Sequence, residues 1–190
     1  MNPRGTLVVI SAPSGGGKNA IIRELLKLFP GSTRFVTTTT RDPRVGEVEG
    51  IDYYFVSDQR FKQLIEQGEM IEYNFFAGNY YGSERQKLEH TLKNHNLTFA
   101  TLDVNGKKQL QDQGVEHLSI FLLPDNIEVL RERVARRGGL SQEQINMRMQ
   151  EAEAEIALAH TYDLPLINSD GNMHEAVAQI QQFLEERLLA

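Results

Sequence analysis

The spacing of apolar residues changes abruptly near the start of the chain. Leu7 to Ile10 form a short aliphatic run, which is typical of a buried strand. From Ile21 onward the apolar residues recur three and four positions apart, as they do on one face of an amphipathic helix. Between these patterns lie three consecutive glycines, Gly15 to Gly17. The pattern therefore predicts a strand, a glycine-rich loop and a helix, in that order.

Strand-like and helix-like patterns alternate again in the second half of the chain. Ser141 to Gln144 match a capping box and predict the start of a long helix. Alternating strands and helices favour an α/β fold in which helices cover both faces of a parallel sheet. Strands are predicted over 97–102, 117–123 and 164–167, and helices over about 84–93, around 107–110, after Pro124-Asp125, after Ser141 and over about 177–184.

A stretch of different character lies between these parts. Residues 35–40, 50–57 and 70–75 have strand-like patterns, and 78–83 resemble a turn that leads into another short strand. We therefore predict a P-loop-type core domain formed by residues 1–33 and 84–190, with a small β-rich insertion over residues 34–83.

Composition excludes several classes of function. The chain has 190 residues, enough for one compact domain, and its formal net charge of −6 argues against a broad nucleic-acid surface. It contains no cysteine, so disulfides and thiolate zinc sites are excluded, and its five histidines are too scattered to suggest a metal site. The apolar run near the N-terminus is too short for a membrane span or signal peptide, so a cytoplasmic location without membrane partners is expected.

The glycine-rich loop predicts a phosphate-binding site. Glycines leave backbone N–H groups bare, the following helix adds its N-terminal dipole, and Lys18 is placed to reach the outer phosphates. A tight turn without a ligand is the alternative, and Lys18 directly before a helix disfavours it. Asn19 stands where P-loops carry the Ser or Thr that binds Mg²⁺. An amide oxygen can also bind Mg²⁺, but that ion tolerates little deviation from octahedral geometry.

Two further groups of residues suggest phosphate chemistry. Arg41, Arg44, Tyr53 and Tyr81 could clamp a second phosphate, although solvated arginines and core tyrosines are the simpler alternative. Glu72 lies in an apolar strand and is either an edge-strand charge or an acceptor for a nucleobase edge.

Four arginines surround Gly138-Gly139, which is the composition expected of a closing lid. The alternative for any single arginine is that a helix C-terminus favours cations without a ligand. They are Arg133, Arg136, Arg137 and Arg148, and the lid would span about residues 133–148. Asp103 follows a predicted strand and could hold Mg²⁺ through water or cap the next helix. Together these groups predict phosphoryl transfer between two phosphate-bearing substrates.

The chain resembles the guanylate kinases over nearly its whole length. The resemblance rests on the segments 11–18, 39–47, 50–53, 78–83 and 145–148. It implies a core domain, a GMP-binding insertion and a lid, and the Mg²⁺-dependent conversion of ATP and GMP or dGMP to ADP and the nucleoside diphosphate. It implies no obligate protein partner.

The resemblance also implies roles for individual residues. Arg41, Arg44, Tyr53 and Tyr81 would hold the GMP phosphate, while Thr37, Glu72 and Ser83 would read guanine. Ser14, Gly15, Gly16, Gly17, Lys18, Asn19, Arg133, Arg137, Arg148 and Asn168 would serve ATP, with Asn168 near adenine and Lys18, Arg41, Arg137 and Arg148 in catalysis. Asn19 and Asp103 would hold magnesium, Asp103 through water.

Two positions depart from the pattern of the guanylate kinases. Asn19 replaces the Ser or Thr that binds Mg²⁺, and Thr101 stands where the family usually has an aspartate near the guanine. We therefore expect a slower enzyme with weaker guanine discrimination. The alternatives are a non-catalytic module of the same fold that binds nucleotides or proteins, and a kinase for another small phosphorylated acceptor.

Overall fold

The structure is a computed structural model that describes residues 5–76, 78–136, 138–139 and 141–189. The chain folds into two compact units. One unit comprises Gly31–His117 and the start of the chain up to Leu7, and the other comprises Val8–Pro30 and Leu118–Ala190. Among the described residues, none of the helices combines the length and apolar character needed to cross a bilayer.

The unit that contains Val8–Pro30 and the C-terminal half is built on parallel strands. β1 (Thr6–Ser11) pairs with β8 (Leu118–Leu123), which pairs in turn with β9 (Leu164–Ile167). The register places Ile10 opposite Ile120 and Ile120 opposite Leu164, so aliphatic side chains share one layer of this sheet. The carboxyl ends of parallel strands are where α/β sheets bind ligands.

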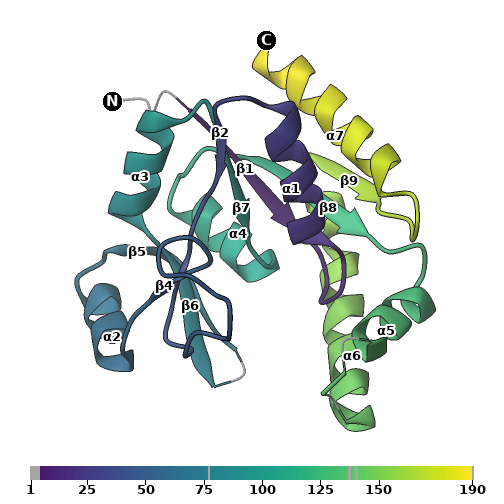
Figure 1. The fold of residues 1–190 in the computed structure, drawn as a ribbon, viewed down its shortest axis with the longest axis horizontal. Helices are drawn as coiled ribbons and strands as arrows, with labels where there is room; N and C mark the ends of the chain where they lie inside the picture. The colour runs from purple at the N-terminus through teal and green to yellow at the C-terminus, as the bar shows by residue number, and fades with distance from the viewer. Residues whose placement is uncertain (1–4, 77, 137, 140, 190) are drawn as a thin grey trace. The chain divides into compact units, whose positions relative to one another are not determined.

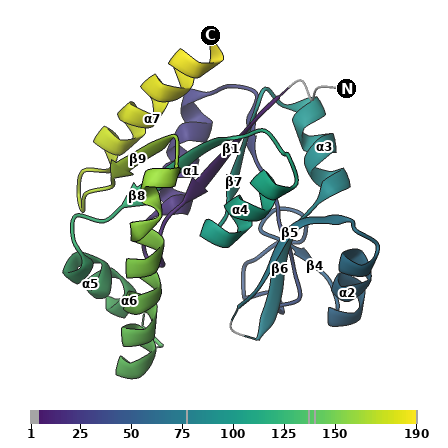
Figure 2. The ribbon, with the colours of Figure 1, turned by 180° about the vertical axis from the view of Figure 1, so that it is seen from behind.

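Helices in this unit bury apolar faces against the strands and against one another. α1 (Lys18–Leu28) lies alongside α7 (Met173–Leu188), as Figure 1 and Figure 2 show. α5 (Ile127–Arg136) packs on α6 (Gln142–Ala157), and a short 3₁₀ helix, η1 (Ala159–Thr161), follows. The contact between α5 and α6 is a buried apolar cluster of Leu130, Val134, Ile145, Met149 and Ala152.

The other unit contains a parallel strand pair and a separate four-stranded sheet. β2 (Ser32–Arg34) pairs in parallel with β7 (Leu97–Thr101). The four-stranded sheet has the order β4-β3-β6-β5, and β5 and β6 form an antiparallel hairpin. Its strands are β3 (Thr38–Thr39), β4 (Tyr54–Phe55), β5 (Met70–Phe76) and β6 (Asn79–Glu84), and the helices of this unit are α2 (Asp58–Glu66), α3 (Arg85–Asn94) and α4 (Val104–Asp112).

The predicted α/β class, with a parallel sheet flanked by helices, is confirmed, and several element boundaries differ from the prediction. The strand expected over 50–57 is limited to Tyr54–Phe55, because Gly50 has a φ of 75° and residues 48–52 form a turn. The helix expected around 107–110 is longer and begins at Val104, since Asp103 caps it. All strands of the four-stranded sheet lie between Thr38 and Glu84, inside or at the edge of the predicted insertion.

The capping box at the start of α6 has the geometry that its sequence predicts. The Gln144 N–H donates to Ser141 Oγ at 3.2 Å, and the Ser141 N–H donates to Gln144 Oε1 at 2.8 Å. Two backbone donors of the first turn are thereby satisfied.

Replacing Ser141 by Ala should lower the free energy of unfolding by about 1 kcal/mol, because one of these acceptors is lost. Ser141→Asp keeps a capping oxygen and should retain most of the stability. Urea unfolding of the three proteins measures the difference. Equal stability of the Ala and Asp variants would contradict this role for Ser141.

Candidate active site

The candidate site residues fall into two groups, one in each unit. The first group surrounds the loop between β1 and α1. Gly15 and Gly17 have φ angles of 90° and 87°, in the left-handed region that favours glycine. Gly16 has no room for a side chain, since a Cβ there would lie 2.5 Å from the Ala12 Cβ. Glycine is therefore favoured at Gly15 and Gly17 by backbone conformation and at Gly16 by lack of space.

The N-terminus of α1 follows directly from this loop. Gly17 is the N-cap and provides no side-chain cap, so the helix presents backbone donors and the positive end of its dipole. Lys18 Nζ donates to the Ala12 carbonyl oxygen at 2.6 Å, so its side chain joins the two ends of the loop. A bare helix N-terminus beside an ammonium group is suited to a phosphate.

Side chains from distant parts of the sequence hold this loop in place. Asn168, which is buried at the end of β9, donates through Nδ2 to the Gly16 carbonyl oxygen at 3.0 Å. Arg133 Nη2 donates to the Asn168 carbonyl oxygen at 3.1 Å and lies 3.6 Å from a carboxylate oxygen of Asp170. In this structure Asn168 supports the loop backbone, and its predicted place near adenine stays a prediction.

Among the predicted lid arginines, Arg148 contacts the loop. Its Nη1 donates to Ser14 Oγ at 2.9 Å, so α6 places a guanidinium beside the glycine loop. Arg136 is exposed at the end of α5, and Arg137 lies outside the described residues. Asn19 is exposed in the first turn of α1.

The second group begins with an arginine that is already paired. Arg41 Nη2 donates to both carboxylate oxygens of Glu47, at 2.8 and 2.9 Å. Partial burial lowers the pKa of the Arg41 guanidinium, but the Glu47 carboxylate outweighs this effect and the net shift is upward. The guanidinium also lies over the Tyr53 ring at 5.4 Å, and the Tyr53 and Tyr81 ring centroids are 6.1 Å apart.

Arg41, Tyr53 and Tyr81 are therefore brought together as predicted, while Arg44 is exposed. Sequence reasoning gave Glu47 no role of its own. Its carboxylate accepts from the Arg44 N–H at 2.8 Å as well as from Arg41, and these contacts keep the pKa of Glu47 below its ordinary value. The sequence did offer a clue to Glu47, because it lies three residues after Arg44 in the segment that contains both arginines.

Glu72 is the most deeply buried charged candidate. Its side chain lies on β5, the residue is only 4% exposed, and Ser83 Oγ donates to Oε1 at 2.6 Å. Glu72 does lie on an edge strand, β5, but its side chain is buried, and its role as an acceptor for a nucleobase edge stays a prediction. Burial raises its pKa to about 7, and the nearby Asp103 carboxylate adds to the shift while Ser83 opposes it.

Asp103 has the capping role that the sequence left open. Its Oδ1 accepts from the Gly106 N–H at 2.7 Å, and its Oδ2 accepts from Asn74 Nδ2 at 2.6 Å. Magnesium binding through water stays a prediction for this residue. In the described part of the chain, no cluster of three or more His, Asp or Glu side chains could hold a metal.

The remaining guanine-reading candidates lie in the same unit. Thr37 directly precedes β3, and its carbonyl oxygen accepts from the Tyr54 N–H at 2.9 Å. Thr101 is the last residue of β7. Gly106 was missed by sequence reasoning, although a glycine inside a helical pattern is a signal: a Cβ there would lie 2.9 Å from Glu72 Oε2.

Comparisons with known proteins decide the family. The family model described as "Guanylate kinase" matches residues 4–187 of the 190-residue chain. The chain belongs to the guanylate kinase family. It is 41% identical to the guanylate kinase of Nostoc sp. over 87% of this chain and 83% of that protein. It is 38% identical to the guanylate kinase of Idiomarina loihiensis over 97% of this chain and 91% of that one.

A solved guanylate kinase has the same fold. The crystal structure of guanylate kinase from Anaplasma phagocytophilum matches this chain with a TM-score of 0.75 and 31% sequence identity. The match covers 97% of this chain and 87% of the other. Membership of the guanylate kinase family, which the sequence motifs indicated, is thus confirmed by sequence and by fold.

The raised pKa of the buried Glu72 makes the free energy of unfolding depend on pH. The folded state keeps a proton on Glu72 up to about pH 7, whereas in the unfolded chain this carboxyl titrates near 4.5. The folded state therefore binds more protons between these values. The stabilising contribution is complete below about pH 4.5 and is lost as the pH rises through about 7.

We expect the free energy of unfolding to fall by about 3 kcal/mol between about pH 5 and about pH 8, relative to Glu72→Gln, which cannot titrate. Urea unfolding of both proteins across this range gives the comparison. Parallel pH profiles for the wild type and the variant would contradict the assignment.

Proposed function

We propose that the chain transfers the γ-phosphoryl group of ATP to GMP or dGMP and releases ADP and the nucleoside diphosphate. The observation that carries the proposal is the buried Glu72 carboxylate, held by Ser83 and adjacent to α4. A carboxylate can accept two parallel hydrogen bonds from the N1–H and the 2-amino group of guanine. Adenine has no such pair of donors on its Watson–Crick edge.

Arg41, Arg44, Tyr53 and Tyr81 would bind the phosphate of GMP. Arg41 Nη2 is oriented by its hydrogen bonds to both carboxylate oxygens of Glu47. An incoming phosphate would replace or share that carboxylate as the partner of the guanidinium. Because Glu47 also accepts from the Arg44 backbone, it positions the two arginines relative to one another. Thr37, Glu72 and Ser83 would read the base.

The loop from Ser14 to Lys18 would bind the phosphates of ATP. Arg133, Arg137 and Arg148 would neutralise the charge that develops on the transferring group, and together with the turn between α5 and α6 they would form the lid, at about residues 133–148. Arg148 is already hydrogen-bonded to Ser14 at the loop. Asn168 would contact ATP on the adenine side while it supports Gly16.

Magnesium would enter with ATP, and it supplies charge neutralisation on the phosphate oxygens when bound. The Asn19 amide fits this role, since it is exposed in the first turn of α1 and carries an oxygen donor. Asp103 fits only through a bridging water, because both its oxygens already accept hydrogen bonds.

A cytoplasmic location, and the absence of nucleic-acid, membrane and obligate protein partners, stay predictions. The division into a core of residues 1–33 and 84–190 and an insertion of residues 34–83 is likewise a proposal about which segments act together.

A coupled ADP-release assay with ATP and Mg²⁺ tests the proposal against GMP, dGMP, AMP, CMP and UMP. Turnover confined to GMP and dGMP is expected. Lys18→Ala should abolish turnover without abolishing GMP binding, since Lys18 belongs to the loop. Binding of GMP without turnover in the wild type would instead favour a non-catalytic binding module, and preferred turnover of another acceptor would overturn the substrate.

Restoring a hydroxyl at position 19 should raise turnover. Asn19→Ser provides the ligand that Mg²⁺ normally finds in a P-loop, and we expect kcat to rise about tenfold, equivalent to about 1.4 kcal/mol. Asn19→Ala, which has no oxygen donor, is the matched control and should be slower than wild type. Steady-state kinetics at varied Mg²⁺ measures both, and an unchanged rate in Asn19→Ser would contradict the proposal.

An aspartate at position 101 should strengthen guanine binding. A charge-assisted hydrogen bond to the base contributes about 1.5–3 kcal/mol, so Thr101→Asp should bind GMP about ten- to a hundredfold more tightly. Thr101→Asn has nearly the same shape without the charge and is the control. Isothermal titration calorimetry with GMP and AMP gives the result, and an equal gain for AMP would show that the residue does not discriminate the base.

A further inference from the structure

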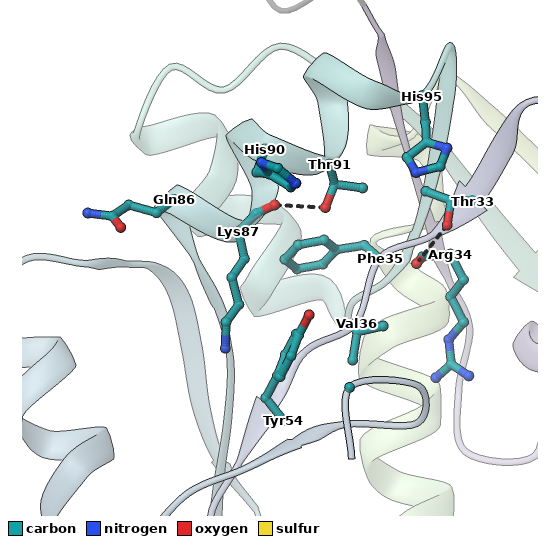
Figure 3. A pocket seen from close by; sticks show the side chains of 11 residues that line it. Thr33, Arg34, Phe35, Val36, Tyr54, Gln86, Lys87, His90, Thr91 and His95 are labelled. Atoms are coloured by element: carbon teal, nitrogen blue, oxygen red, sulfur yellow. Dashed lines mark hydrogen bonds between the residues drawn. The ribbon is translucent and has the colours of Figure 1, made fainter. Parts of the chain in front are cut away.

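A cavity of about 370 Å³ lies in the unit that contains α3, away from the residues assigned to nucleotides. It is bounded by the segment 33–36, by Gly50 and Tyr54, and by one face of α3, as Figure 3 shows. None of the candidate nucleotide-binding residues lines it. The lining residues are Thr33, Arg34, Phe35, Val36, Gly50, Tyr54, Gln86, Lys87, His90, Thr91 and His95.

The charge of this lining is one-sided. It contains an arginine, a lysine and two histidines but no carboxylate, in a chain whose formal net charge is −6. Lys87 is partly neutralised, because its Nζ lies 2.6 Å from a carboxylate oxygen of Glu84. Arg34 belongs to none of the ion pairs formed by the described residues, and its buried Nε has no hydrogen-bond partner among them. A buried donor without an acceptor is costly unless a ligand provides one.

The cavity also has an apolar side. Phe35 is only 3% exposed and, with Val36, it lies between the Lys87 amine and the Arg34 guanidinium in the view of Figure 3. The Lys87 amine lies 3.4 Å from the centre of the Tyr54 ring, which closes one side. The Thr91 hydroxyl already donates to the Lys87 carbonyl oxygen at 2.7 Å. The other donor-bearing side chains of the lining include those of Arg34, Tyr54, Gln86, Lys87 and the two histidines.

We propose that this cavity binds a small organic anion, a carboxylate or a phosphate monoester with an apolar body. The body rests against Phe35 and Val36, and the Arg34 guanidinium takes the charge. The volume is within the range of small-molecule sites. Arginine matches the geometry of both anions by donating two parallel hydrogen bonds.

The cavity and the proposed acceptor clamp lie on opposite faces of one extended segment. Neighbouring side chains of a strand point to opposite sides. Tyr53 lies against Arg41, whereas Tyr54 lies against Lys87. The anion site therefore does not require the GMP site to be empty, and the proposal does not depend on kinase activity.

Amide NMR titration of the intact chain tests the proposal. The probes are benzoate and phenyl phosphate, with benzyl alcohol as a neutral ligand of similar shape and inorganic phosphate as an anion without an apolar body. Saturable shifts of Val36, Tyr54, Lys87 and His90 amides with benzoate, phenyl phosphate or both are expected, and the preferred probe identifies the anion. Weaker shifts are expected with the two control ligands.

Arg34→Gln should weaken binding of the preferred probe about tenfold or more, since a charge-assisted hydrogen bond is lost. Arg60→Gln removes an exposed arginine from α2 in the same unit and should leave the affinity unchanged. If Arg34→Gln gives a spectrum without native dispersion, His90→Gln on the exposed side of α3 provides the second variant, with a smaller loss expected.

Three outcomes would overturn the proposal. One is the absence of saturable shifts at these amides with either anion. Another is equal binding of benzyl alcohol. The third is shifts confined to the Gly15–Lys18 loop or to Arg41, which would place the anions in the proposed nucleotide site instead.

Discussion

The backbone conformation of Gly15 to Gly17 is the constraint on which the proposed binding of phosphate depends. Two of its residues have left-handed φ angles and the third has no room for a Cβ, so the loop cannot be stabilised by side chains of its own. It is stabilised from outside: Asn168 donates to its backbone, Lys18 spans it, and Arg148 contacts Ser14. The position of the loop backbone, whose N–H groups would bind a phosphate, is thereby determined.

A second theme is that the charged groups of the site are paired before a ligand arrives. Arg41 is held by Glu47, Arg133 lies close to Asp125 and Asp170, and Glu72 accepts from Ser83. A partly buried guanidinium or carboxylate without a partner would destabilise the fold. Each partner also orients its group. In the proposed function, a phosphate or a base edge would therefore meet a side chain that folding has already ordered.

Glu72 shows how one environment serves both stability and recognition. Burial favours its protonated form near neutral pH, whereas two hydrogen bonds from a guanine edge would favour the carboxylate. Gly106 leaves room for Oε2 on the side of α4, and Asp103 on the same helix terminus adds negative charge. In the proposed function, base recognition would therefore be coupled to the protonation state of one buried residue, through its packing.

Much of this could be predicted from sequence, because the relevant signals are local. The strand, glycine loop and helix, the capping box at Ser141, the arginine-rich segment around Arg41 and the family itself follow from short motifs and apolar spacing. The sequence could not predict the hydrogen bond from Asn168 to the Gly16 carbonyl oxygen or the ion pair between Arg41 and Glu47. Nor could it predict the cationic cavity between Arg34 and α3. These contacts join residues that are up to 152 positions apart, or depend on which side chain fills which space. Only the packed chain decides them, since long-range contacts and burial are properties of the tertiary fold.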